Sequence, residues 1–155
     1  LSLLIILSLC IAGGAARSAG DEAPILAVDS VGMTVSDMDR SVDFYSKCFG
    51  LTVADRRDWP EFSLTYMSNP ENDFEVELTV NKSRTEPYDL GNGYGHVAFV
   101  VDDLDGEHAR IKAAGFQPKD IKEMTHEGQP FGRFFFIEDP DGYKIEVLQR
   151  RGRFK

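Results

Sequence analysis

Cysteine and tryptophan are scarce in this sequence of 155 residues, and basic residues are outnumbered by acidic ones. There are 2 cysteines and 1 tryptophan, and 17 lysines and arginines stand against 26 acidic residues, for a net charge of −9. A surface this acidic does not attract a phosphate backbone, so we exclude nucleic acid as a partner. We interpret the short basic stretch at residues 150–155 as a solvated terminus.

The shortage of cysteine limits how the chain can be stabilised. Cys10 lies in the apolar N-terminal stretch, which leaves Cys48 alone in a processed chain, so no internal disulfide is expected. Hydrophobic residues make up 42% of the sequence and include 11 phenylalanines, which is enough apolar material for a packed core. We therefore expect stability to come from core packing, supported by a metal or a dimer.

Long apolar runs are absent except at the N-terminus, where residues 1–11 are apolar and residues 12–20 are mostly small. Ser18 and Gly20 occupy positions −3 and −1 of a cleavage site before Asp21, which is typical of a secretory signal peptide. The run is short for a membrane span. We predict a signal peptide at residues 1–20 and a single domain at 21–155, with no membrane span after processing. A retained anchor is the alternative. A processed chain would be periplasmic, secreted or organellar, and a chain without a signal peptide would be cytoplasmic.

The rest of the chain contains an internal repeat. Residues 30–39 align with residues 96–105 at an offset of 66, and in each copy an apolar strand-like run ends in an aspartate suited to cap a helix. Apolar or aromatic residues follow at helical spacing in both copies, at Met38, Val42 and Tyr45 and at Leu104, His108 and Ile111.

Three strands are expected after each helix. The candidates are residues 51–54, 63–67 and 74–80, and then 117–118 onward, 133–138 and 143–148. Each half then reads βαβββ, over about 27–81 and 94–150. A sheet covered by one helix leaves its other face open, so two halves can curve around a shared cavity. The sequence predicts an α+β fold in which tandem βαβββ repeats form curved mixed sheets around a metal pocket.

Three residues are candidates for a metal pocket: His96, Glu77 and Glu146. Glu77 and Glu146 lie at equivalent points of the last strand of each half, between apolar residues. A carboxylate inside an apolar strand costs free energy unless it is paired or binds a metal. A solvated strand face is the competing interpretation, because Glu75 shares the strand parity of Glu77. His108 is interpreted as a helix packing residue, and His126, in an expected loop at 124–131, as a bystander or lid residue.

Several segments resemble glyoxalase I of the vicinal-oxygen-chelate superfamily over about residues 27–149. They are residues 36–45, 77–81, 88–91, 94–98 and 138–146, and the last is the most specific because it joins a turn to a ligand strand at fixed spacing. The resemblance implies one divalent metal, Zn²⁺ or Ni²⁺, with Glu77, His96 and Glu146 as ligands. Ser30 stands at the fourth ligand position, where the family has His or Gln, and could act through a water.

The resemblance also implies a reaction. The glutathione–methylglyoxal hemithioacetal would be isomerised to lactoylglutathione, which detoxifies methylglyoxal, with Glu146 as the base and Glu77 as its near-symmetric counterpart. Asn81 matches a glutathione-contacting residue of the family, and Thr34 stands where the family has a glutathione-binding arginine. Small two-half chains of this family usually form homodimers. The alternatives are a non-catalytic small-molecule-binding member and another metal enzyme of the superfamily.

Overall fold

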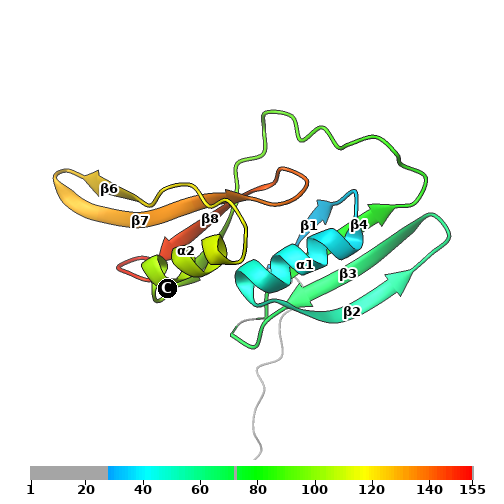
Figure 1. The fold of residues 1–155 in the computed structure, drawn as a ribbon, viewed down its shortest axis with the longest axis horizontal. Helices are drawn as coiled ribbons and strands as arrows, with labels where there is room; N and C mark the ends of the chain where they lie inside the picture. Colours follow the sequence, from blue (N-terminus) through cyan, green and yellow to red (C-terminus); the bar gives the residue numbers. More distant parts are fainter. Residues whose placement is uncertain (1–27, 72, 155) are drawn as a thin grey trace, which may run out of the picture.

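The computed structural model describes residues 28–71 and 73–154 and contains two halves of identical element order, which lie side by side in Figure 1. The first half holds β1 (Ser30–Thr34), α1 (Met38–Phe49), β2 (Thr52–Asp58), β3 (Phe62–Ser68) and β4 (Glu75–Asn81). The second holds β5 (Val97–Val101), α2 (Leu104–Ala113), β6 (Lys122–His126), β7 (Gln129–Glu138) and β8 (Lys144–Gln149). The predicted βαβββ repeat and α+β class are confirmed. The predicted signal peptide lies outside the described residues.

Each half forms one mixed four-stranded sheet, in the order β1-β4-β3-β2 in the first half and β5-β8-β7-β6 in the second. The first and last strands of each half pair in parallel, and the remaining pairs are antiparallel. This topology brings residues distant in the sequence side by side. Gly32 of β1 faces Glu77 of β4, and Ala98 of β5 faces Glu146 of β8.

Both helices begin at the predicted aspartate caps. The Asp37 side chain accepts a hydrogen bond from the Arg40 N–H at 3.0 Å, and that of Asp103 accepts one from the Gly106 N–H at 2.9 Å. The first helix ends at Gly50, whose φ of 64° is the left-handed conformation that glycine adopts without strain. The caps hold α1 and α2 in register with the strands before them, as the sequence predicted.

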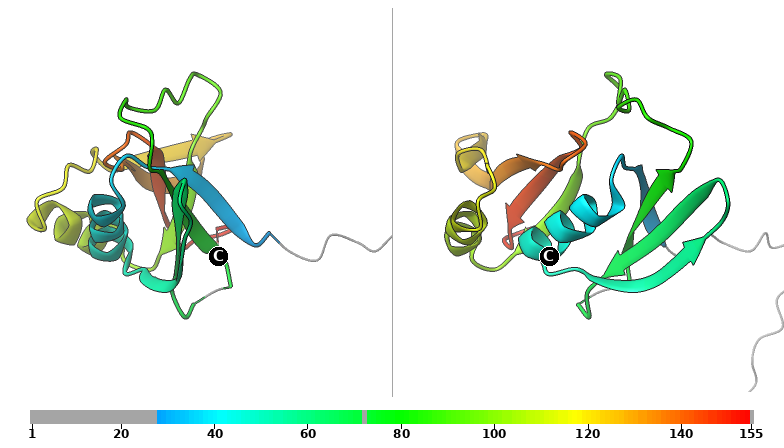
Figure 2. Two further views of the ribbon diagram at one scale, coloured as in Figure 1. Left: turned by 90° about the vertical axis from the view of Figure 1, so that its right-hand side faces the viewer. Right: turned by 45° about the vertical axis from the view of Figure 1, so that its right-hand side comes forward.

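One hydrophobic core joins the two halves. Phe44 of α1 packs edge-to-face on Phe116 with 5.3 Å between ring centroids, and Phe49 stacks on Phe99 of β5 at 4.5 Å. The two helices lie beside each other in the left view of Figure 2. Burying an aromatic or aliphatic side chain of this size contributes about 1.5–3 kcal/mol, so these contacts fix the halves together. No helix in the described part of the chain is long and apolar enough to cross a membrane.

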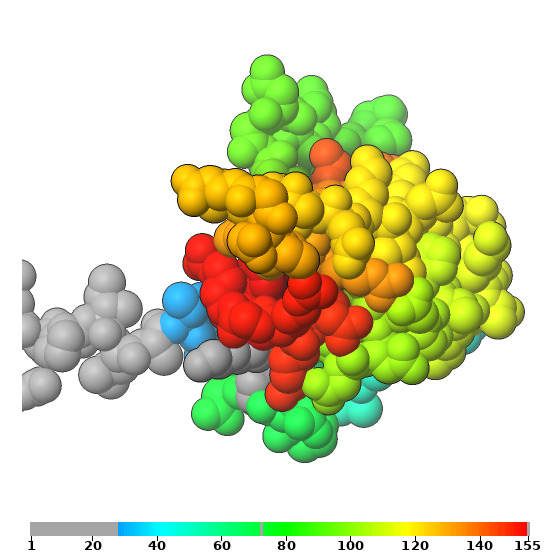
Figure 3. Space-filling view, turned by 90° about the vertical axis from the view of Figure 1, so that its left-hand side faces the viewer, coloured from blue at the N-terminus to red at the C-terminus, as the bar shows by residue number. Residues whose placement is uncertain are grey.

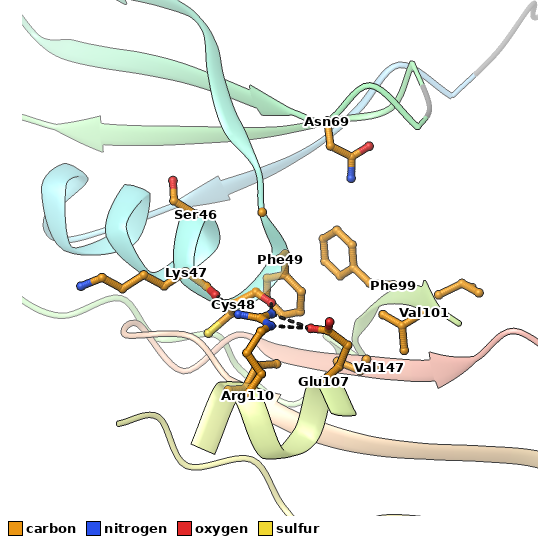
Figure 4. Close-up of a pocket in the computed structure, with 13 residues that line it drawn as sticks. Ser46, Lys47, Cys48, Phe49, Asn69, Phe99, Val101, Glu107, Arg110 and Val147 are labelled. Carbon is orange, nitrogen blue, oxygen red and sulfur yellow. Dashed lines mark hydrogen bonds and ion pairs between the residues drawn. The ribbon is translucent and has the colours of Figure 1, made fainter. Parts of the chain in front are cut away.

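Arg110 ties the helices together at the hollow shown in Figure 4, which has a volume of about 360 Å³. Its guanidinium donates to the carbonyl oxygens of Lys47 and Cys48, both at 2.6 Å, and to the Glu107 carboxylate. Carbonyls in the last turn of a helix have no partner within the helix, and Arg110 supplies one from α2. Burial raises the pKa of the nearby Cys48 thiol to about 12, so this cysteine is a packing residue rather than a nucleophile.

The turn between β7 and β8 forms a second joint between the halves. Asp139 is 5% exposed, and its carboxylate accepts hydrogen bonds from the Tyr45 hydroxyl at 3.0 Å and from two backbone N–H groups at 2.9 Å. Asp141 accepts bonds from the Ser36 backbone and side chain and pairs with Arg40 at 3.4 Å. The acidic turn of the second half is therefore held against the start of α1.

Asp139→Asn is expected to stabilise the protein at neutral pH. Burial raises the pKa of Asp139, and the hydrogen bonds it accepts only partly offset this, so its charge costs stability as pH rises through the unfolded-state value. Asparagine keeps an oxygen for the two N–H groups and carries no charge. Thermal melts should show a Tm about 4 °C higher at neutral pH, with the difference shrinking below about pH 4. A lower Tm at neutral pH would mean that the ionised bond to Tyr45 outweighs burial.

The second half differs from expectation around β6. A strand was expected from residue 117 and a loop at 124–131, but β6 begins at Lys122 and a two-residue turn, Glu127-Gly128, leads directly into β7. Both turn residues have positive φ, 50° and 75°, which suits the twist of a tight hairpin. Glutamate rarely adopts this conformation, so the turn could not be predicted from the sequence. His126 ends β6 with its side chain 76% exposed rather than lying in a loop.

The end of the chain folds back on this hairpin. Phe154 packs edge-to-face on Phe131 of β7 with centroids 5.7 Å apart, and Arg151 forms an isolated bridge with Phe154. In Figure 3 the red C-terminal residues lie directly beside the orange residues of the hairpin. The basic end of the chain, expected as a solvated terminus, thus rests on the second sheet up to Phe154.

Candidate metal-binding half-sites

The helix-free face of each sheet carries the candidate site residues. In β4, Val76 and Leu78 are buried in the core, so strand alternation places Glu77 on the opposite face. In β8, Ile145 and Val147 are buried in the core, and Glu146 points to the opposite face. The two glutamates therefore hold equivalent places on their sheets, as the repeat predicted.

His96 and Glu146 lie in contact on the second sheet. His96 Nε2 is 3.2 Å from Glu146 Oε2, and the two side chains are 43% and 14% exposed. The His96 ring meets Phe136 edge-on with centroids 5.6 Å apart, and Phe136 is also the β7 residue that pairs with Glu146. An imidazole nitrogen and a carboxylate oxygen converging beside an aromatic ring are donors suited to a divalent cation such as zinc. The chemistry of this pair fits the expected metal.

Glu77 and Ser30 lie on the first sheet. Glu77 pairs with Gly32 on one side and with Tyr66 of β3 on the other, and Ser30 lies two residues before Gly32 on the same face. The pKa of the Tyr66 hydroxyl is raised, first by desolvation and then by the charge of Glu77. Tyr66 and Phe136 occupy equivalent places beside the two glutamates, a correspondence that only the strand register reveals.

Within one chain, Glu77 does not join the His96–Glu146 pair. Among residues 28–71 and 73–154, no group of three or more histidines, cysteines, aspartates or glutamates is placed to hold a metal ion. One chain presents two half-sites: Ser30 with Glu77 on the first sheet, and His96 with Glu146 on the second. A complete four-ligand site would need the first half-site of one chain against the second half-site of another.

The residues expected to contact glutathione both bind tyrosines. Asn81 Nδ2 donates to the Tyr88 hydroxyl at 2.8 Å, and Thr34 Oγ1 lies 3.2 Å from the Tyr143 hydroxyl. Neither tyrosine contact was predicted from the sequence, because both depend on how the linker and the β7–β8 turn fold over the first sheet. His108 packs as expected, with its ring on Phe135 and Nε2 3.0 Å from the Lys119 carbonyl oxygen.

Comparison with known proteins places this chain in one family. Residues 27–147 match the glyoxalase/bleomycin resistance protein/dioxygenase superfamily. The chain belongs to this superfamily.

Within this superfamily, the chain is similar to proteins named lactoylglutathione lyase or glyoxalase I. It is 40% identical over 124 residues to a lactoylglutathione lyase of Neisseria meningitidis, covering 77% of this chain and 87% of that protein. A probable lactoylglutathione lyase of Synechocystis is 36% identical over 119 residues, covering 74% and 88%. The crystal structure of maize glyoxalase I superposes with a TM-score of 0.70 at 32% identity, covering 81% of this chain and 45% of the maize chain.

Proposed function

We propose that the protein is a metal-dependent lactoylglutathione lyase that isomerises the hemithioacetal of glutathione and methylglyoxal. The observation that carries this proposal is the His96–Glu146 contact, in which a candidate metal ligand and a candidate base converge on the open face of the second sheet. The similarity to lactoylglutathione lyases supports the choice of reaction.

Glu146 has the chemistry the reaction requires. Its carboxylate would remove the proton from the carbon that bears sulfur and return it to the neighbouring carbon, which converts a hydroxy-ketone arrangement into a hydroxy-thioester. Glu146 is only 14% exposed and lies beside Phe136 in the sheet, so little of the carboxylate is open to solvent. Glu77 is the near-symmetric counterpart. A divalent metal held by His96, Glu146 and Glu77 would supply Lewis-acid stabilisation of negative charge on the substrate oxygens.

The candidate ligands favour a metal ion that is intermediate between hard and soft. One imidazole and two carboxylates suit Zn²⁺ or Ni²⁺, and both carboxylates offset the +2 charge. Ser30 is a weak fourth ligand because its hydroxyl is short and neutral, so a water held by Ser30 would complete the shell. We further propose a homodimer, because it would bring Ser30 and Glu77 of one protomer against His96 and Glu146 of the other. Export through residues 1–20 stays a prediction.

The assay that tests this function starts from protein stripped of metal and reloaded with Zn²⁺ or Ni²⁺. Incubation with preformed hemithioacetal should release the lactoyl thioester at a rate that depends on the added metal and falls to background after chelation. The His126→Ala variant should behave as wild type, since that histidine is exposed far along the hairpin. Absence of thioester with every divalent metal would overturn the lyase proposal and favour a binding protein of the same fold.

A further inference from the structure

Arg84 is held in a fixed position at the start of the linker that arches from β4 to β5 (Figure 1). Its guanidinium lies over the Tyr88 ring, with the central carbon 4.2 Å from the centroid, and Nη2 donates to the Pro87 carbonyl oxygen at 2.7 Å. The Arg84 N–H donates to the Asn81 carbonyl oxygen at 3.1 Å. Stacking on an aromatic ring restricts a side chain that would otherwise sample many rotamers.

Within residues 28–71 and 73–154, no carboxylate neutralises the charge of Arg84. Most other arginines with ordered contacts pair with an acid, as Arg133 does with Asp105 and Arg110 with Glu107. Across the described ranges, Arg84 forms no ion pair. One guanidinium nitrogen binds a backbone oxygen, and the remaining N–H groups are available to a ligand.

A second donor lies beside it. The Tyr88 hydroxyl accepts a hydrogen bond from Asn81 Nδ2, so its own proton is free to be donated. Both side chains border a cavity of about 50 Å³ whose wall holds a single acid, Glu86. A fixed guanidinium and a hydroxyl donor around a small cavity match the shape and charge of a carboxylate.

The position suits the far end of a tripeptide substrate. Asn81 lies on the same face of β4 as Glu77 and about 13 Å further along the strand, from the rise per residue of a strand. Glutathione carries its sulfur on the central cysteine, and the carboxylate of its γ-glutamyl residue lies eight bonds away, about 10 Å when extended. An adduct whose substrate oxygens lie at the metal, just beyond the sulfur, would therefore bring this carboxylate near Arg84.

We propose that Arg84, positioned by Tyr88, binds a carboxylate of the glutathionyl group and so determines specificity for the thiol. The inference rests on the proposed function for its ligand, but it concerns binding and not the proton transfer. Glu86 opposes this binding by its charge, so its neutralisation should strengthen it.

The test is calorimetric titration of the metal-loaded protein with S-methylglutathione, which binds without reacting. Arg84→Ala should weaken binding about 10- to 100-fold, the loss expected for a charged hydrogen bond, and Glu86→Gln should tighten it. Arg153→Ala is the matched control, since Arg153 also stacks on an aromatic ring, Phe154, but lies in the C-terminal tail. Its affinity should stay within about twofold of wild type.

Ligands amidated at one carboxylate complete the test. S-methylglutathione amidated at the carboxylate that Arg84 binds should have about the same weak affinity for wild type as S-methylglutathione has for Arg84→Ala. The affinity of this amidated ligand should be the same for wild type and for Arg84→Ala. The proposal is overturned if wild type does not bind S-methylglutathione, if Arg84→Ala binds as wild type does, or if Arg153→Ala loses as much. A protein that binds through Arg84 but isomerises no hemithioacetal would overturn the lyase proposal and leave this one standing.

Discussion

Glu146→Gln is expected to lower hemithioacetal turnover by about 100- to 10,000-fold, the usual effect of losing a general base. Glutamine has nearly the same shape and keeps an oxygen for weak coordination, but it cannot accept a proton at neutral pH. The folded state should survive, because Glu146 is partly exposed and an amide beside Phe136 costs less to desolvate than a carboxylate. The thermal melt of the metal-free variant should therefore match or exceed that of the wild type.

A matched control distinguishes the loss of the catalytic base from the loss of one negative charge. Glu138→Gln removes one carboxylate from the exposed end of β7, where Glu138 lies opposite Lys144 in the strand register. This variant should leave turnover unchanged. Steady-state rates of both variants, with metal content measured on the same samples, decide the matter. If Glu146→Gln binds metal and keeps most of its rate, the base lies elsewhere, and Glu77 is the next candidate.

The sequence predicted the local structure well because its signals are local. The caps at Asp37 and Asp103 and the glycine at position 50 act within a few residues, and the structure confirms them. The equivalent places of Glu77 and Glu146 followed from the repeat and strand alternation, so their location on open faces was predictable. The β6–β7 hairpin was not, because Glu127 adopts a positive φ that composition does not suggest.

Contacts between the halves could not be predicted from the sequence. The arrangement depends on Arg110 reaching the end of α1 and on Asp139 meeting Tyr45, contacts 62 and 94 residues apart. No periodicity marks such pairs, since they depend on how two finished units pack. The same limit applies to Tyr88 beside Asn81. For this reason the sequence suggested candidate metal ligands but could not decide whether one chain or two would complete the site.

Two inactive variants can show whether one chain or two completes the metal site. Glu77→Gln removes a ligand from the first half-site, and Glu146→Gln removes the base from the second. If each site joins half-sites of two protomers, a mixed dimer contains one site with both substitutions and one with neither. Random exchange makes about half of the dimers mixed, so about a quarter of wild-type activity should return.

The decisive measurement is therefore hemithioacetal isomerisation by the two variants, first separately and then after they are unfolded together and refolded with metal. A mixture of wild type with Glu146→Gln, treated in the same way, calibrates refolding yield. A site shared between two protomers predicts near-background rates from each variant alone and recovery to about a quarter of the wild-type rate in the mixture. If the mixture refolds fully and its isomerisation rate stays at the mean of the rates of the two separate variants, a site shared between two chains is contradicted.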